Sequence, residues 1–324
     1  AHTPYEVNRY TALALKARIA LFEGTWLRYH QQGDEQTVQD LLAQAAEAAR
    51  AVITEGGYSL HIGGTQPYRD LFTSLTADPD EVILARAYNA TVSLTHNATS
   101  YLRCQSEGQC GATKHLLNQY LLLSGEPYTN QEGYDTISLH NELTNRDPRL
   151  AQTIRTPGYS RTVTNKDGSK TQKQYAPDLS VSVTGYQPIK YVYKDESSKD
   201  AYNASDMDLI IFRTAEIYLN YAEAKAELGT LTQDDLDISV NKLRDRVGMP
   251  AMNLEAANQS PDPFLKNKEW GGYQNVQKGG NEGVILEIRR ERTIELAQEG
   301  HRYYDIIRWK EGKIFEQPLY GLHS

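Results

Sequence analysis

The sequence predicts a mostly α-helical fold: tetratricopeptide-like helical hairpins flank a long, irregular, loop-rich insertion that carries short β-strands. Paired segments near both ends repeat apolar residues and alanines at helical spacing. Residues 57–208, between them, are rich in Tyr, Gly, Ser, Thr and Asn and contain only short β-type runs. A content of 39% hydrophobic and 23% charged residues is typical of a globular chain, not of a disordered one.

The first predicted hairpin occupies residues 1–56. Its second helix shows the stronger amphipathic pattern, with apolar residues at i, i+3, i+4 and i+7, namely Val38, Leu41, Leu42, Ala45, Ala49 and Val52. Alanines in both helices let the two backbones approach closely. One such hairpin cannot bury its apolar face alone, so neighbouring helices are expected.

A second hairpin is predicted over residues 209–250, with Gly229 between its helices and Gly248 and Pro250 at its end. Residues 251–324 are predicted to form a loop followed by a helical corner at 287–309. Its charges predict a partly buried ion network, including i,i+3 pairs of Glu287 with Arg290 and of Arg292 with Glu295.

The insertion is predicted to bind the ligand, because a long irregular segment in a compact helical protein is usually functional. Within it, residues 81–84 are predicted to form a strand and residues 115–123 a helix, and Asn165–Gly168 is predicted to be a hairpin turn. The chain has 22 Tyr but only 5 Phe and 3 Trp, and Tyr suits half-wet recognition surfaces better than dry cores.

Charge and sequence motifs exclude several functional classes. A net charge of −8 argues against a nucleic-acid partner. No nucleophile elbow, HExxH motif or phosphate loop occurs, and paired carboxylates fall in turns, helix starts or charged helix faces, so the chain is predicted not to be an enzyme. No cofactor is predicted. Calcium at Asp78, Asp80 and Glu81 is an alternative to solvated loop acids.

The only two cysteines, Cys104 and Cys110, allow three interpretations: a short-loop disulfide, two free thiols, or half of a metal site. Nearby histidines lack zinc-finger spacing. A disulfide is favoured, and it would imply an oxidising, exported location. The first residues lack a signal peptide and no apolar run could span a bilayer, so the protein is either cytosolic or this chain begins downstream of its natural start.

Seven motifs follow one another along the chain. They are YTALALKARIA at Tyr10–Ala20, GYSL at Gly57–Leu60, YRDLF at Tyr68–Phe72, NRDPRL at Asn145–Leu150, LIIFRTAEIYLNYAEA at Leu209–Ala224, LRDRVGMP at Leu243–Pro250 and RRERTIELAQEGHRYYD at Arg289–Asp305. In this order they resemble the SusD/RagB family of surface nutrient-binding lipoproteins of Bacteroidetes. Each motif is moderate evidence, and their shared order makes the resemblance strong.

The resemblance implies glycan binding on the outer face of the outer membrane and delivery to a SusC-like TonB-dependent transporter. It also implies an N-terminal lipid anchor. The family's lipobox cysteine, its first helical repeats and much of its C-terminal tail are missing here, so residues 1–324 are interpreted as a partial SusD-like domain. A peptide-binding lid of the same architecture and a tetratricopeptide adaptor for proteins are the alternatives.

Interleaved aromatics and amides identify the candidate ligand site, because sugar rings stack on aromatic planes and their hydroxyls bond to polar side chains. The best candidates are Tyr88, Asn89, His96, Asn97, Tyr101 and Arg103. A second group comprises Tyr128, Tyr159 and Tyr186, and a third Trp270 and Tyr273. The family signature of the corner is expected to act as a structural brace, formed by Arg289, Arg292, Glu295, Asp305 and Trp309.

Overall fold

The computed structural model describes residues 3–103, 109–277 and 279–322. They form two compact units. Unit 1 comprises the residues up to 61, 79–84 and 211–318, and unit 2 comprises 62–78, 85–210 and those from 319. The predicted helical fold is confirmed, since helices dominate the described residues and strands form only two-stranded sheets there. None of the described helices is long and apolar enough to cross a membrane.

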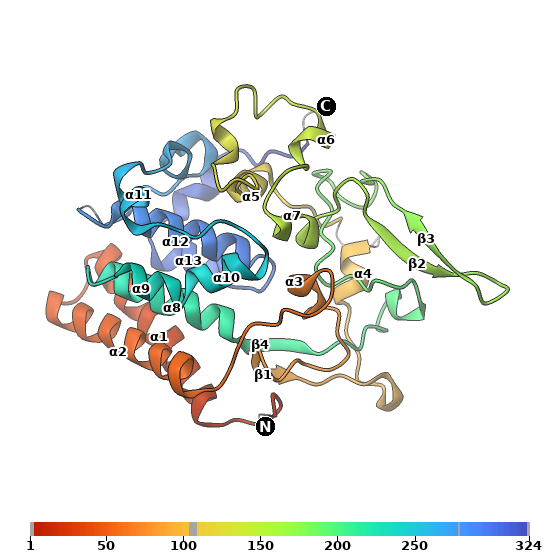
Figure 1. Cartoon of the computed structure of the whole chain (residues 1–324), viewed down its shortest axis with the longest axis horizontal. Helices are drawn as coiled ribbons and strands as arrows, with labels where there is room; N and C mark the ends of the chain where they lie inside the picture. The colour runs from red at the N-terminus through yellow and green to blue at the C-terminus, as the bar shows by residue number, and fades with distance from the viewer. Residues whose placement is uncertain (1–2, 104–108, 278, 323–324) are drawn as a thin grey trace. The chain divides into compact units, whose positions relative to one another are not determined.

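Unit 1 begins with the predicted hairpin, α1 (Arg9–His30) and α2 (Glu35–Glu55). Asn8 caps α1 and Asp34 caps α2, each by accepting bonds from the first-turn backbone N–H groups. Fully buried alanines lie along both helices, which allows close packing of α1 on α2. The helix α8 (Thr214–Glu227) packs on α2, so the first and second predicted hairpins share one apolar core (Figure 1).

The second helix of the downstream hairpin differs from the prediction. It is divided into α9 (Gln233–Asp237) and α10 (Val240–Arg246). The hydroxyl of Ser239 donates to the carbonyl of Asp235 four residues earlier, and such side-chain bonds compete with continued helix. The unit is completed by α11 (Leu254–Gln259), α12 (Glu282–Glu295) and α13 (Arg302–Arg308), with 3₁₀ turns at Pro263–Lys266, Lys268–Trp270 and Gly312–Glu316.

Unit 2 contains short elements joined by long irregular segments. Its helices are α3 (Pro67–Asp70), α4 (Ala98–Arg103), α5 (Lys114–Gln119), α6 (Leu139–Glu142) and α7 (Pro148–Thr153), with 3₁₀ turns at Ala90–Val92, Tyr128–Asn130 and Ser198–Asp200. The predicted helix at 115–123 is therefore shorter than expected. It ends at Gln119, and Tyr120 has an extended backbone.

Two small sheets complete the description. The strands β2 (Ser160–Thr164) and β3 (Lys170–Gln174) pair antiparallel around the predicted turn, where Gly168 has a φ of +82° (Figure 1). That left-handed conformation favours glycine. The strand β1 (Val82–Arg86), predicted at 81–84, pairs with β4 (Leu209–Arg213).

Arginines satisfy much of the irregular backbone of unit 2. Arg146 is buried and donates to the carbonyls of Glu142, Leu117 and Tyr120 at 2.6, 2.6 and 2.8 Å. Arg69 likewise donates to the carbonyl of Val192 at 2.7 Å. Since a buried carbonyl without a partner is costly, these side chains replace the hydrogen bonds that helices or sheets would supply.

Candidate functional site

The segment 86–103, predicted to hold the ligand site, starts with a tight loop in unit 2. Asn89 and Leu94 exchange two backbone hydrogen bonds of 2.9 and 3.1 Å across the loop. The backbone N–H of Tyr88 donates to the carboxylate of Asp208 at 2.9 Å. The ring of Tyr88 packs edge-on against His96 at 4.5 Å between centroids, and the guanidinium of Arg86 lies 5.1 Å from its centre.

His96 holds this loop through both ring nitrogens. Its Nε2 lies 2.9 Å from the carbonyl oxygen of Met207, and its Nδ1 accepts from the backbone N–H of Ala98 at 3.2 Å. Both contacts require a neutral ring with its proton on Nε2. Burial lowers the pKa of His96, which agrees with that form. The histidine therefore positions Tyr88 and is not a free ligand group.

An asparagine pair joins this segment to a distant loop. Asn97 Nδ2 donates to Asn203 Oδ1 at 2.9 Å, and the Asn203 backbone N–H donates back to Asn97 Oδ1. Backbone bonds between His96 and Ser205 extend the ladder. Tyr101 lies one helical turn after Asn97 and Tyr202 directly precedes Asn203. The ladder thus holds two tyrosine residues that are 45% and 59% exposed.

We call Tyr88, Tyr101 and Tyr202 the aromatic surface. Tyr202 did not emerge from the sequence analysis, although a signal was present. The tripeptide Tyr-Asn-Ala occurs at 88–90 and again at 202–204. In the first copy the asparagine caps the 3₁₀ turn by accepting from Thr91, and in the second it bonds to Asn97. In both copies the asparagine shapes the loop and the tyrosine precedes it.

The charged groups beside this surface are paired. Arg103 lies 2.8 Å from Asp200 and 3.7 Å from Glu196, so this candidate is occupied by carboxylates. Burial acts to raise the pKa of Glu196, but a hydrogen bond from Tyr175 and the charges of Arg161 and Arg103 outweigh it and lower the pKa. Glu196 is thus ionised at neutral pH and holds no proton to donate to a substrate.

The second group of candidate tyrosines lies in the interior of unit 2. Tyr128, Tyr159 and Tyr186 are buried. The hydroxyl of Tyr128 donates to the carbonyl of Tyr134 at 2.8 Å, and that of Tyr186 to Glu142 at 2.8 Å. These side chains present no face to a ligand. Tyr273 of the third group is buried as well, in unit 1.

The signature corner forms a buried ion network, as its sequence predicts. Arg292 Nε lies 2.8 Å from Asp305, and Arg308 lies 2.9 Å from the same carboxylate. Arg308 also donates to Glu223 at 2.7 Å, and the indole N–H of Trp309 donates to Glu223 at 2.7 Å. Burial acts to raise the pKa of Asp305, but Arg292 and Arg308 outweigh it and lower the pKa to about 2.

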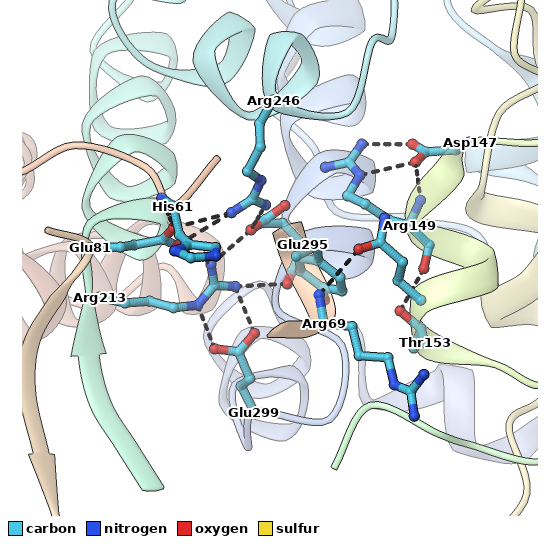
Figure 2. Close-up of polar contacts among 12 residues, drawn as sticks. His61, Arg69, Glu81, Asp147, Arg149, Thr153, Arg213, Arg246, Glu295 and Glu299 are labelled. Atoms are coloured by element: carbon cyan, nitrogen blue, oxygen red, sulfur yellow. Dashed lines mark hydrogen bonds and ion pairs between the residues drawn. The ribbon is translucent and has the colours of Figure 1, made fainter. Parts of the chain in front are cut away.

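One predicted pair is wrong: Glu295 contacts Arg213 and Arg246, at 2.8 and 2.6 Å, instead of Arg292 (Figure 2). Both arginines also contact Glu81, at 2.9 and 3.3 Å, and Arg213 contacts Glu299 at 2.7 Å. The i,i+3 rule failed because two arginines from distant segments, Arg213 of β4 and Arg246 of α10, bind Glu295. The pair of Glu287 and Arg290 does form, at 3.6 Å.

Arg289, the remaining signature arginine, is fully buried in unit 1. Its guanidinium lies 4.4 Å from the ring centre of Trp309 and 5.0 Å from that of Tyr29, with Glu311 at 3.4 Å. Aromatic faces and a carboxylate together replace the water that a buried guanidinium loses. Every signature residue therefore has a packing role.

No group of three histidines, cysteines or acids that could hold a metal ion lies within residues 3–103, 109–277 and 279–322. The Glu81 carboxylate already accepts from two arginines and from the backbone N–H of His61. Calcium at the 78–81 loop stays a prediction. Cys104 lies outside the described residues while Cys110 is exposed, so the disulfide also stays a prediction, which titration of thiols in denaturant would test.

Comparison with known proteins gives a consistent result. A model of the SusD family matches residues 80–320. A SusD-like protein of Formosa agariphila is 32% identical over 115 residues, which are 36% of this chain and 18% of that protein. A SusD-like protein of Bacteroides fragilis superposes with a TM-score of 0.61 at 25% identity, over 94% of this chain and 55% of that one.

A second solved structure, a SusD-like carbohydrate binding protein of Bacteroides fragilis, superposes with a TM-score of 0.66 at 22% identity. The match covers 98% of this chain and 55% of that chain. This chain therefore spans about half the length of the solved relatives it matches.

Proposed function

The chain belongs to the SusD family, and on that premise we propose that it binds oligosaccharides or polysaccharides and that the aromatic surface of unit 2 contacts them. The exposure of Tyr101 and Tyr202 is the observation that carries the proposal. Both are held by the asparagine ladder at their backbone while their rings stay open to solvent. Tyrosine offers a flat apolar face with a polar tip, which suits the C–H face and the hydroxyls of a sugar.

Capture without chemical conversion is the second part of the proposal. The carboxylates near the aromatic surface are committed to cations: Asp200 to Arg103, and Asp206 to Lys199 at 2.7 Å. A hydrolase of glycosides needs one protonated and one ionised carboxyl group across the scissile bond. Carboxylates that are held in ion pairs do not provide the protonated carboxyl group that such a hydrolase needs.

Delivery to a transporter is the third part. The bound glycan would pass to a SusC-like TonB-dependent partner at the outer face of the outer membrane, with a lipid at the N-terminus of the full-length protein as anchor. Contacts at a few exposed tyrosines give low affinity per site. Anchoring the protein beside the transporter channel would compensate for this low affinity, because it raises the local concentration of the glycan at the channel.

Affinity electrophoresis with a panel of soluble polysaccharides tests the proposal. Tyr101→Ala and Tyr202→Ala are each expected to weaken binding of a retarding polysaccharide by about tenfold, the loss of one stacking contact. Tyr303→Ala is the matched control, since Tyr303 is equally exposed but lies on α13 of unit 1. It should bind as the unaltered chain does.

The outcomes separate the site from the function. If polysaccharides bind and both unit 2 variants bind equally well, the site is wrong and the function stands. If no polysaccharide retards the chain while a peptide library does, the peptide-binding alternative replaces glycan binding. If neither polysaccharides nor peptides retard the chain, the tetratricopeptide adaptor for proteins is the remaining alternative.

A further inference from the structure

Arg155 of unit 2 is a buried arginine that forms no ion pair with the described residues. It is only 8% exposed, and its side chain makes one hydrogen bond to them, from Nη1 to the carbonyl oxygen of Ala176 at 2.6 Å. Its Nε is buried and has no partner. The carboxylate of Asp178, an exposed acid whose charge acts on Arg155, instead accepts from Ser180 at 2.6 and 2.9 Å. Because a buried charged donor without an acceptor is costly, this guanidinium is suited to an acceptor that comes from a ligand.

The unused part of the Arg155 guanidinium is the part that recognises anions. Nε and Nη2 of an arginine form a fork that can bind two oxygens of a carboxylate or of a similar oxyanion side by side. Arg18 shows this geometry in unit 1, where Nε and Nη2 each lie 2.6 Å from the carboxylate of Glu216. In Arg155 the same two groups make no hydrogen bond with the described residues.

Two tyrosine rings hold the Arg155 guanidinium in place. Its central carbon lies 5.4 Å from the ring centre of Tyr159 and 5.6 Å from that of Tyr175. The backbone N–H of Tyr175 donates to the carbonyl of Tyr159 at 3.0 Å, beside the paired strands β2 and β3. The backbone N–H of Arg155 itself donates to the carbonyl of Gln187 at 2.8 Å. The fork is therefore preorganised, which lowers the entropy cost of binding an anion.

Arg155 is linked to the aromatic surface through a short series of contacts. The hydroxyl of Tyr175 donates to Glu196, and Glu196 lies 3.7 Å from Arg103. Arg103 follows Tyr101 by two residues on α4. Burial lowers the pKa of Arg155, and the positive charge of Arg103 lowers it further, so the two guanidinium groups interact. The fork therefore belongs to the same part of unit 2 as the exposed tyrosines.

The local charge favours an anion, although the chain as a whole carries a net charge of −8. Near the fork, the carboxylates of Glu196 and Asp200 are shared by Arg103 and Arg161. Lys173 is exposed and, among the described residues, forms no ion pair. An acidic chain repels polyanions in general, so an anionic ligand would bind where unpaired cations gather.

We infer that Arg155 binds a carboxylate or sulfate group of the glycan, so that the polysaccharides recognised by unit 2 are anionic. This inference rests on the proposed function, because the aromatic surface must hold the sugar rings while the arginine binds one of their substituents. Uronic acids supply carboxylates and sulfate esters supply sulfates, and both groups offer two oxygens to the fork. A neutral glycan would leave the fork empty and would be held by the aromatic surface alone.

Isothermal titration calorimetry with two pairs of polymers tests the inference. Polygalacturonate is compared with its methyl ester, and dextran sulfate with dextran, because each pair shares a backbone and differs in charge. In at least one pair the anionic polymer should bind at least about tenfold more tightly than its neutral partner. The pair that shows this difference distinguishes carboxylate from sulfate. Any other uronate or sulfated polymer that retards the chain is compared in the same way with its esterified or desulfated form.

Arg155→Gln gives the sharper result. It removes the charge and the fork, and should weaken binding of the anionic polymer by about ten- to a hundredfold while the neutral partner binds as before. Unchanged binding of the neutral partner also shows that the variant has folded. Arg155→Lys should lose nearly as much, because lysine keeps the charge but not the fork.

Two further variants serve as controls for Arg155→Gln. Tyr101→Ala should weaken binding of both members of a pair equally, since stacking does not depend on the charge of the sugar. Arg146→Gln is the matched control, because Arg146 is a buried arginine of the same unit whose Nη1 and Nη2 both donate to carbonyls. It should leave the preference for the anionic polymer unchanged.

The outcomes separate this inference from the proposed function. If neutral polysaccharides bind as tightly as anionic ones, or if Arg155→Gln weakens both members of a pair equally, the inference is wrong and glycan binding stands. Full affinity in Arg155→Lys would show that charge alone acts, and would overturn the role of the fork. If no polysaccharide of any kind binds, the proposed function itself fails.

Discussion

Two buried arginines of unit 1 and two of unit 2 have different partners. Arg308 and Arg213 of unit 1 face carboxylates. Burial acts to lower the pKa of Arg308 and of Arg213, but the acids around them outweigh it and raise both pKa values. In unit 2 Arg146 and Arg69 face mainly carbonyl oxygens, and burial lowers their pKa values, that of Arg146 to about 10.

The difference follows from the backbone. Helices bond most of their own carbonyls internally, so a guanidinium buried among helices finds few free neutral acceptors, such as the Glu295 carbonyl that accepts from Arg213, and is held mainly by carboxylates. Irregular segments leave carbonyls without partners, and long arginine side chains supply the missing donors. Ion pairs therefore dominate around the buried arginines of unit 1. Unit 2 has buried ion pairs as well, such as Arg149 with Asp147, but there Arg146 and Arg69 also fix irregular segments by donating to backbone carbonyls.

The largest expected effect is that of Arg308→Gln in unit 1. It leaves the carboxylates of Asp305 and Glu223 buried without their shared cation, and should lower the free energy of unfolding by about 3–5 kcal/mol. Urea denaturation measures it, with the exposed Arg50→Gln as control. A loss below about 1 kcal/mol would contradict the view that ion pairs brace this unit.

Acid should weaken unit 1 through Asp305. Its pKa of about 2 in the folded chain is below the usual value near 4, so the stabilisation is complete above pH 4 and is lost as the pH falls towards 2. The loss is of the order of 2 kcal/mol. In Asp305→Asn this part of the pH dependence should be absent, as unfolding free energies from pH 5 to pH 2 would reveal. Equal slopes in both proteins would refute the assignment.

Arg146→Gln in unit 2 should cost less than Arg308→Gln, about 1–2 kcal/mol, because it removes donors to neutral carbonyls and leaves no pair of buried acids. The same denaturation experiment measures both variants. If the two losses are equal, or if the order is reversed, the contrast between the units fails.

Tyr202→Ala should have the smallest effect on stability, within about 0.5 kcal/mol, because the side chain is mostly exposed. Thermal unfolding beside the binding assay distinguishes the two roles. A marked drop in melting temperature would show that this tyrosine packs, and would remove it from the aromatic surface.

Sequence reasoning succeeded where a signal is local or repeated. The hairpin of α1 and α2 was predictable because its apolar period and caps lie within short windows. The turn at Gly168 needed only its Asn-Lys-Asp-Gly sequence. The division of α9 from α10 was missed, since the apolar period continues through Ser239, where the backbone leaves the helical conformation.

The candidate site was predictable only in part. The segment 86–103 has a visible concentration of aromatics and amides, yet the sequence could not separate exposed from buried tyrosines. Tyr101 and Tyr186 look alike as residues, and one is open to solvent while the other bonds to Glu142 in the interior. Exposure depends on distant segments that pack over a side chain.

By itself the sequence determined the helical class, the family and the presence of a charged signature, because periodicity and motif order are properties of the chain. Only the tertiary structure decided the partners: that Glu295 contacts Arg213 and Arg246, and that Asn97 reaches Asn203 across 106 positions. Which distant residues contact each other depends on many tertiary contacts that form together, and no short stretch of sequence contains that information.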